Sequence, residues 1–116
     1  MSLKYTVRNE APAVIILLQG RIVTDLDTVD LLKEIQTNLD NNQKSFFFDL
    51  SQLEYITSSG LNFFVRILTR TRNVGAEVTL CGIQGNVEKL FTISKLNEIF
   101  TFSVSIEEAL NNVNAQ

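Results

Sequence analysis

The feature that most constrains the fold is an alternation of short apolar runs with segments of helical periodicity. Three runs are almost continuously apolar, as strands buried on both faces are: residues 13–19 (AVIILLQ), 45–50 (SFFFDL) and 76–82 (AEVTLCG). Two weaker runs, 4–10 (KYTVRNE) and 100–104 (FTFSV), predict a further strand before and after them. Helical spacing of apolar residues is found in four segments: 24–42, 58–75, 84–99 and 105–112.

This order of elements, β-β-α-β-α-β-α-β-α, predicts an α/β fold. Strands that alternate with helices form a mainly parallel sheet covered by those helices. The first two strands are separated only by the turn at Ala11-Pro12, so we expect them to be antiparallel and the sheet to be mixed. We therefore predict a single domain over residues 1–116, with about five strands and about four α-helices.

Charge and composition exclude several classes of protein. The net charge is −3, and the densest basic cluster, Arg66, Arg70 and Arg72, falls on one predicted helix, so we expect no nucleic-acid partner. The longest apolar run, residues 14–18, is far shorter than the ~20 residues of a membrane helix, and no signal peptide precedes it, which predicts a cytoplasmic protein without membrane insertion. The lone Cys81 excludes an internal disulfide, and its apolar neighbours predict a buried, inert thiol.

Catalytic motifs are absent from the sequence. The chain has no histidine, which excludes a Ser-His-Asp triad and a histidine-ligated zinc. It has no G-x-x-x-x-G-K-[ST] phosphate loop, and Ile56 occupies the position of the first glycine in a G-x-S-x-G elbow around Ser58. Asp25, Asp49 and Glu54 lie near predicted strand ends, where they are either a convergent acid pair or solvated loop acids. We predict no enzyme, no catalytic residue, no metal ligand and no cofactor.

The polar cluster Thr57-Ser58-Ser59-Gly60 interrupts an apolar stretch and begins a helix. Loops that leave the carboxyl ends of parallel strands are where functional groups gather in α/β sheets. One serine or threonine here is explained by N-capping, which contributes ~1 kcal/mol. Capping needs a single hydroxyl, however, and this cluster supplies three in a row.

Three stripes run along the helix that follows, at about 100° per residue. Leu61, Phe64, Val65 and Leu68 are predicted to face the core, and Asn62, Arg66, Thr69 and Asn73 form a polar stripe. Phe63, Ile67 and Val74 form a third, apolar stripe nearly opposite the predicted core face. This third stripe either packs against a neighbouring helix or forms a surface for a partner one turn from the serines.

Several motifs together resemble the STAS domains, a family shared by anti-sigma factor antagonists and the tails of sulphate transporters. The segment FDLSQLEYITSSGL (48–61) resembles the family signature, in which a strand end leads to an acidic residue, two hydroxyl residues, Gly and Leu. The segments LQGRI (18–22), VTLCGI (78–83) and the C-terminal third, which ends in Glu-Ala-Leu, are similar to other elements of the family. The resemblance covers nearly the whole chain and implies a STAS-like single domain.

The resemblance implies a protein-binding switch. Unphosphorylated members bind an anti-sigma factor that is also a serine kinase, the kinase phosphorylates the first serine of the motif, and a PP2C-type phosphatase reverses the modification. That serine falls on Ser58, with Thr57, Ser59, Gly60, Asp25 and Asp49 as its expected surroundings. The partner-binding residues expected beside it are Asn62, Phe63, Arg66 and Ile67.

Two positions depart from the family pattern. Thr57 replaces the usual acidic residue before the serine, and Val23 lies near a second position that is often acidic. Two alternatives therefore stay open. One is a STAS module that is not phosphorylated and docks to a membrane transporter or another signalling complex. The other is a small hydrolase or nucleotide-binding protein that uses Ser58 and Asp49.

Overall fold

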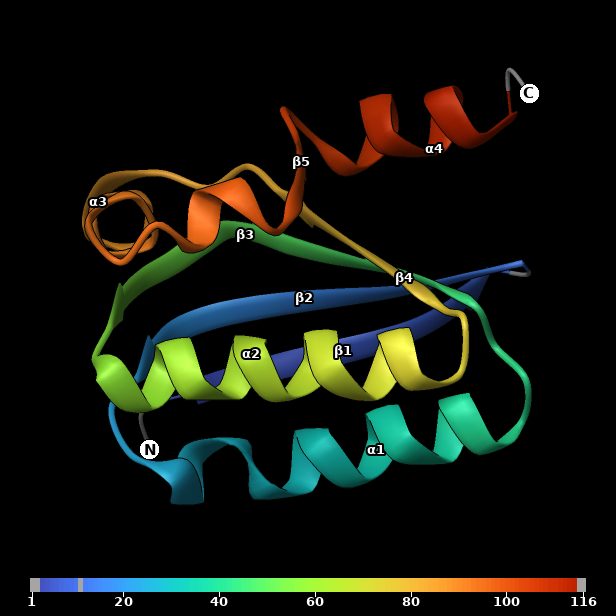
Figure 1. Cartoon of the computed structure of the whole chain (residues 1–116), viewed down its shortest axis with the longest axis horizontal. Helices are drawn as coiled ribbons and strands as arrows, with labels where there is room; N and C mark the ends of the chain where they lie inside the picture. Colours follow the sequence, from blue (N-terminus) through green and yellow to red (C-terminus); the bar gives the residue numbers. More distant parts are fainter. Residues whose placement is uncertain (1–2, 11, 115–116) are drawn as a thin grey trace.

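The computed structural model of the chain describes residues 3–10 and 12–114, which form one five-stranded sheet flanked by helices (Figure 1). The described elements follow the predicted order and include two additional short 3-10 helices, η1 and η2. In chain order the elements are β1 (Leu3–Glu10), β2 (Ala13–Ile22), η1 (Asp25–Thr28), α1 (Val29–Asp40), β3 (Ser45–Ile56), α2 (Ser58–Asn73), β4 (Glu77–Cys81), α3 (Gly85–Ile93), η2 (Leu96–Glu98), β5 (Thr101–Ser103) and α4 (Ile106–Asn114).

The strands lie in the sheet in chain order, β1-β2-β3-β4-β5. β1 and β2 form an antiparallel hairpin in which Glu10 pairs with Ala13, and the other three pairings are parallel. The mixed, mainly parallel sheet predicted from the alternation of strands and helices is therefore confirmed.

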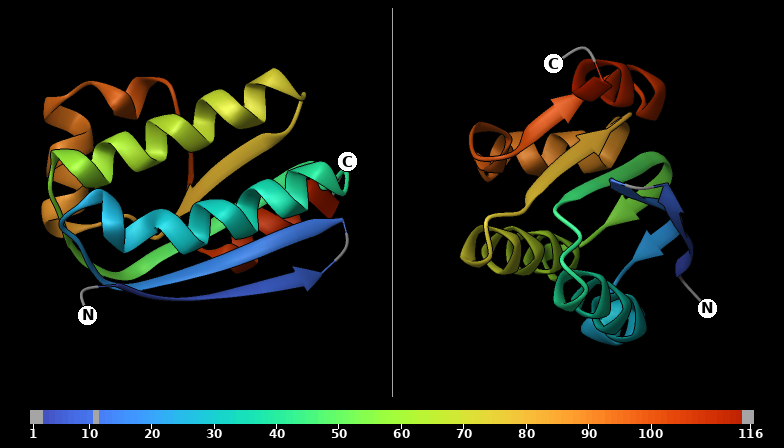
Figure 2. Two further views of the ribbon diagram at one scale, coloured as in Figure 1. Left: turned by 90° about the horizontal axis from the view of Figure 1, so that it is seen from below. Right: turned by 90° about the vertical axis from the view of Figure 1, so that its right-hand side faces the viewer.

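The two faces of the sheet are covered unequally. The main core lies on the face covered by α1, α2 and α3, which contribute Leu31, Phe64 and Phe91 among others. The opposite face carries a smaller cluster in which Phe47 and Cys81 pack under Ala109 of α4. Figure 2 shows α1 and α2 side by side on one side of the sheet and α4 on the other. None of the helices in the described ranges is both long enough and apolar enough to cross a membrane.

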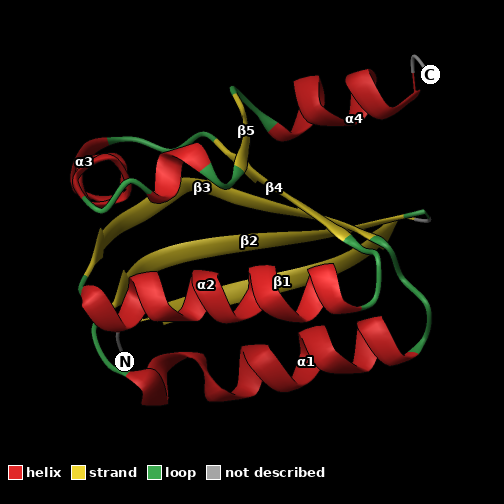
Figure 3. Ribbon diagram, in the orientation of Figure 1, coloured by secondary structure: helices red, strands yellow, loops and turns green. Residues whose placement is uncertain are grey.

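β3 is longer than the sequence predicted. It was expected to end at Asp49, yet it continues to Ile56 as a single strand that ends directly before α2 (Figure 3). Its second half pairs only with β2, and irregularities in that register, between Leu17 and Gln19 and again between Gly20 and Arg21, break the simple alternation of side chains. The buried residues are consequently Leu50, Leu53 and Ile56. This spacing of three differs from the alternation by which a strand is recognised in a sequence.

Two residues of the third stripe, Phe63 and Ile67, belong to the core, which contradicts the prediction that they form a partner-binding surface, whereas Val74, just after α2, is exposed. Phe63 is 1% exposed and Ile67 is fully buried. The ring of Phe63 lies edge-on to Phe48 of the sheet, at 6.3 Å, while the neighbouring Phe64 contacts Phe91 of α3 at 5.4 Å. Because α2 is packed against the sheet and a further helix, adjacent positions on it are buried together. Val65, predicted to face the core, is instead 36% exposed.

Candidate functional site

Ser58 is the first residue of α2 and lies at the surface. Its hydroxyl has no hydrogen-bond partner among the described residues, so it is not required to hold the helix in place. The role of N-cap, which the sequence left open among three hydroxyl residues, is taken by Thr57. The helix start thus leaves Ser58 free for chemistry or contact.

Thr57 ties the start of α2 to the end of β2. Its hydroxyl accepts a hydrogen bond from the amide of Ser59 at 3.2 Å and donates one to the carbonyl of Val23 at 2.8 Å. Its own amide donates to the carbonyl of Ile22 at 3.1 Å. These contacts fix Ser58, the next residue, at the carboxyl end of the sheet.

Gly60 allows α2 to approach the ends of β2 and β3. A Cβ atom at this position would lie 2.6 Å from Cβ of Ile56 and 3.4 Å from Cβ of Ile22. Carbon atoms in contact are normally 3.5–4.0 Å apart, so only glycine fits without displacement of the helix. The glycine that follows the serines therefore has a steric role in setting how closely the serines lie against the sheet.

A short turn beside Ser58, residues 23–28, carries apolar side chains to the surface; we call it the Leu26 turn. It consists of the residues just after β2 together with η1, and it contacts the first part of α2 (Figure 1). Leu26 is 83% exposed, and Val23 and, just beyond the turn, Val29 are partly exposed. This apolar surface was not predicted, although one signal was available. Leu26 lies between two aspartates and does not share the helical spacing of Leu32, Ile35 and Leu39, which are buried on α1.

Asp27 stabilises the Leu26 turn through hydrogen bonds within the turn. One carboxylate oxygen of Asp27 accepts hydrogen bonds from the amides of Val23, at 2.9 Å, and Thr24, at 3.0 Å. These two bonds, first that from Thr24, lower the pKa of Asp27 below its usual value, because they favour the charged form. The turn is therefore a defined structure at neutral pH.

Two acids were predicted to lie near Ser58, and the structure places one of them there and the other far from it. Asp25 is exposed on η1, in the Leu26 turn. Asp49 lies seven residues before the end of β3, roughly 20 Å along the strand, and on the face opposite α2, where it lines a small cavity with Ile106 of α4. It accepts bonds from the amide and hydroxyl of Ser51. The assignment of Asp49 to the surroundings of Ser58 is therefore wrong.

Asp49 instead lies beside Cys81, with which it is paired in register. Cys81 is fully buried, and this burial, with a smaller contribution from the Asp49 carboxylate, raises the pKa of its thiol to about 12. The prediction that this thiol is buried is confirmed, and the raised pKa disfavours the thiolate form that nucleophilic cysteines use.

The outer surface of α2 continues from Ser58 with polar side chains. Asn62 and Arg66, which the sequence assigned to partner binding, are both exposed one and two turns along the helix. Together with the Leu26 turn they surround Ser58 with an apolar patch on one side and a polar helix surface on the other.

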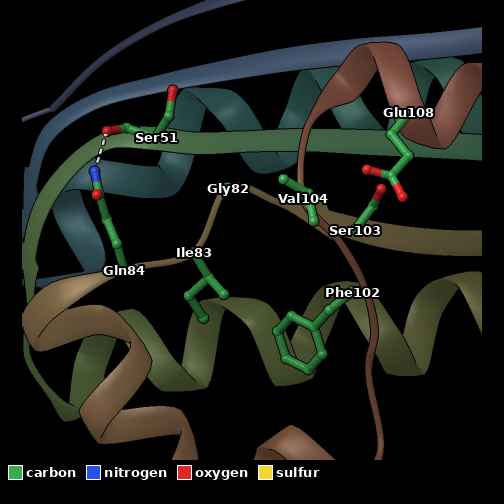
Figure 4. Close-up of a pocket in the computed structure, with 8 residues that line it drawn as sticks. All are labelled: Ser51, Gly82, Ile83, Gln84, Phe102, Ser103, Val104 and Glu108. Carbon is green, nitrogen blue, oxygen red and sulfur yellow. Dashed lines mark hydrogen bonds between the residues drawn. The ribbon is translucent and has the colours of Figure 1, made fainter.

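A separate depression opens at the carboxyl ends of β4 and β5, with a volume of about 650 Å³ (Figure 4). Three of its polar side chains are engaged within the protein: Gln84 donates to the carbonyl of Ser51 at 2.6 Å, and the hydroxyls of Ser51 and Ser103 donate to Asp49 and to the carbonyl of Ser105. Within residues 3–10 and 12–114, no three His, Cys, Asp or Glu side chains gather as metal ligands would. Nothing in this depression converges on Ser58.

Comparisons with known proteins agree with this fold. The family model described as "STAS domain" matches residues 7–109. A protein of Bordetella bronchiseptica named "Putative anti-sigma factor antagonist BtrV" is 30% identical over 107 residues, 92% of this chain and 91% of BtrV. Among solved structures, unphosphorylated SpoIIAA, an anti-sigma factor antagonist, has a TM-score of 0.78 at 16% identity, covering 97% of this chain and all of SpoIIAA. Phosphorylated SpoIIAA from Bacillus has a TM-score of 0.76 at 18% identity, covering 95% of this chain and 99% of that one.

Proposed function

Because the chain belongs to the STAS domain family, we propose that it is an anti-sigma factor antagonist whose binding is switched by phosphorylation of Ser58. The observation that carries this proposal is the Ser58 hydroxyl, which is exposed at the start of α2, next to the Leu26 turn, and has no hydrogen-bond partner within residues 3–10 and 12–114. In this function the protein binds and is modified, and it catalyses no reaction itself.

The domain is suited to carry a phosphate at Ser58. The first amides of a helix lack carbonyl partners within it, and the helix dipole favours negative charge at this end. Residue 58 is the first residue of α2, so its phosphate would lie close to those groups. SpoIIAA, which has the same fold, has been solved in both phosphorylated and unphosphorylated forms. We therefore expect phosphorylation to leave the fold of this chain unchanged.

A partner docked over Ser58 would respond differently from the domain. The phosphate adds 1.5 to 2 negative charges. One like charge of the partner ~5 Å away costs roughly 3 kcal/mol at an effective dielectric constant of 20, which is more than a hundredfold in affinity. Burial of the phosphate against the apolar Leu26 turn would add to this cost. Affinity would be lost while the fold stays intact.

The partner expected for this surface is an anti-sigma factor that is also a serine kinase. Leu26 supplies an apolar anchor, and Asn62 and Arg66 supply polar contacts from α2. When the kinase phosphorylates Ser58 it dissociates from its own product, and a PP2C-type phosphatase returns the protein to the binding form. The use of ATP as phosphate donor places this cycle in the cytoplasm.

Intact-mass spectrometry tests the modification. Incubation with the candidate kinase and ATP should add ~80 Da, the mass of one phosphoryl group, to the wild-type protein and none to Ser58→Ala. Ser59→Ala is the matched control, because it removes the neighbouring hydroxyl, and it should be labelled as the wild type is. Labelling that persists in Ser58→Ala would assign the phosphate to another residue.

Co-purification with the tagged protein separates the proposal from its alternative. Recovery of an ATP-binding kinase that is lost from a Ser58→Glu variant supports the switch. Recovery of transporter subunits, equally with Ser58→Glu and with wild type, would instead indicate a docking module in which the serines only begin a helix.

A further inference from the structure

Thr57 performs two tasks with one hydroxyl group. As an acceptor it caps α2 through the amide of Ser59, and as a donor it holds the carbonyl of Val23, the first residue of the Leu26 turn. A hydroxyl has one donor and two acceptor positions, so both bonds form at once. The phosphoacceptor and the Leu26 turn, 30 residues apart in the chain, are thereby linked through a single side chain.

The acceptor task alone does not require threonine. A carboxylate also caps a helix well, and an acidic residue is what the family pattern resembled by this chain has before the serine. An ionised carboxylate has no donor, however, and would face the carbonyl oxygen of Val23, another acceptor. The departure from the pattern at Thr57 thus adds the bond of 2.8 Å to Val23 and keeps the cap.

The hydrogen bond from Thr57 to Val23 lies just beyond the end of β2, where the backbone pairing of β2 with β3 has ended. The amide of Thr57 donates a hydrogen bond to the carbonyl of Ile22, the last residue of β2, at 3.1 Å. Beyond Ile22 the turn depends on Asp27, which binds the amides of Val23 and Thr24 from inside the turn. Within the described residues, the Thr57 hydroxyl provides the side-chain hydrogen bond that connects this turn to α2.

We propose that Thr57 is a positioning residue that holds the Leu26 turn beside Ser58, so that a partner meets one preformed surface. Its relevance to binding rests on the proposed function, whereas its effect on the turn does not. A preformed surface loses less conformational freedom on binding, which raises affinity without any new contact. In this proposal Thr57 holds the turn in place, and Leu26 and Ser58 make the contacts with the partner.

Solvent-exchange NMR of backbone amides tests the proposal with three substitutions at one position. Thr57→Ser keeps donor and acceptor, Thr57→Asp keeps only the acceptor, and Thr57→Val keeps neither. We expect exchange at Val23, Thr24 and Asp27 to be roughly 2- to 10-fold faster in the Asp and Val variants, the effect of one net hydrogen bond, and unchanged in Thr57→Ser.

The amide of Ser59 serves as an internal reference for the cap. Its exchange should rise in Thr57→Val and stay at the wild-type value in Thr57→Asp, because aspartate still caps the helix. Thr69→Val, which removes an exposed hydroxyl bonded to Val65 within α2, is the matched control and should leave the turn unaffected. Unchanged exchange in the turn of both Asp and Val variants would overturn the proposal, as would faster exchange in Thr57→Ser.

A binding measurement completes the test. With the kinase used for labelling as titrant, both Thr57→Val and Thr57→Asp should bind several-fold more weakly than wild type, and Thr57→Ser should match it. A loss in Thr57→Asp alone would assign the effect to charge and overturn positioning. If wild type itself neither binds nor is labelled, the proposed function fails, and the exchange data still decide whether Thr57 orders the turn.

Discussion

Replacement of Phe63 by alanine should destabilise the domain strongly, although the sequence analysis assigned this residue to partner binding. Phe63 is 1% exposed, and its ring lies 6.3 Å from that of Phe48 and 5.1 Å from that of Phe64, both edge-on. Truncation of a buried phenylalanine costs about 3–5 kcal/mol, from lost transfer energy and the cavity left behind. Domains of this size have about 5–15 kcal/mol of stability in total.

Urea unfolding followed by circular dichroism measures this effect. With a slope of about 2 kcal/mol per molar urea, the midpoint of Phe63→Ala should fall by roughly 1.5–2.5 M. Val65→Ala is the matched control, because Val65 lies on the same helix but is 36% exposed, and its midpoint should move much less. Equal midpoints for the two variants, together with loss of partner binding only in Phe63→Ala, would return Phe63 to the interface and refute its place in the core.

Three further substitutions test the site and its surroundings. Leu26→Asp should weaken kinase binding at least tenfold in calorimetry, since burial of one leucine contributes about 1.5–3 kcal/mol. Ile93 of α3 is similarly exposed, and Ile93→Asp should leave binding unchanged. Equal losses in the two variants would contradict a local docking patch. Gly60→Ala should cost about 1–3 kcal/mol in urea unfolding, because its Cβ would lie 2.6 Å from Ile56; an unchanged midpoint would show that α2 is free to shift. Asp27 has a pKa that is lowered on folding, so its contribution to stability is complete above its unfolded pKa of about 4 and is lost as the pH falls through the folded value. Asp27→Asn should therefore flatten the dependence of the melting temperature on pH below about 4, and a slope equal to that of wild type would contradict this role.

The sequence predicted the order of elements well because the strands of a covered parallel sheet are continuously apolar. Residues 13–19, 45–50 and 76–82 were recognised in this way, and the structure places strands in all three. The second half of β3 was missed, since irregular pairing with β2 replaced alternation by a spacing of three at Leu50, Leu53 and Ile56. Periodicity reveals a strand only while its register is regular.

The site was predicted only in part, because sequence patterns report local structure and not the packing of the whole fold. The position of Ser58 at a helix start follows from local rules for strand ends and caps, which act over a few residues. Which face of α2 is buried depends on how many neighbours surround the helix, and that is a property of the whole fold. A single core stripe was assumed, so Phe63 and Ile67 were assigned to partner binding, with packing against a neighbouring helix as the alternative, and the exposed Leu26 was overlooked. The bond between Thr57 and Val23 joins distant segments and leaves no trace in either one.

The affinity of the anti-sigma factor kinase for two forms of this protein, unmodified and phosphorylated on Ser58, tests the central claim most directly. Calorimetric titration of the two forms, with circular dichroism to verify that both are folded, should give dissociation constants that differ by at least a hundredfold in favour of the unmodified form. Equal affinities for two folded forms would contradict a switch at Ser58.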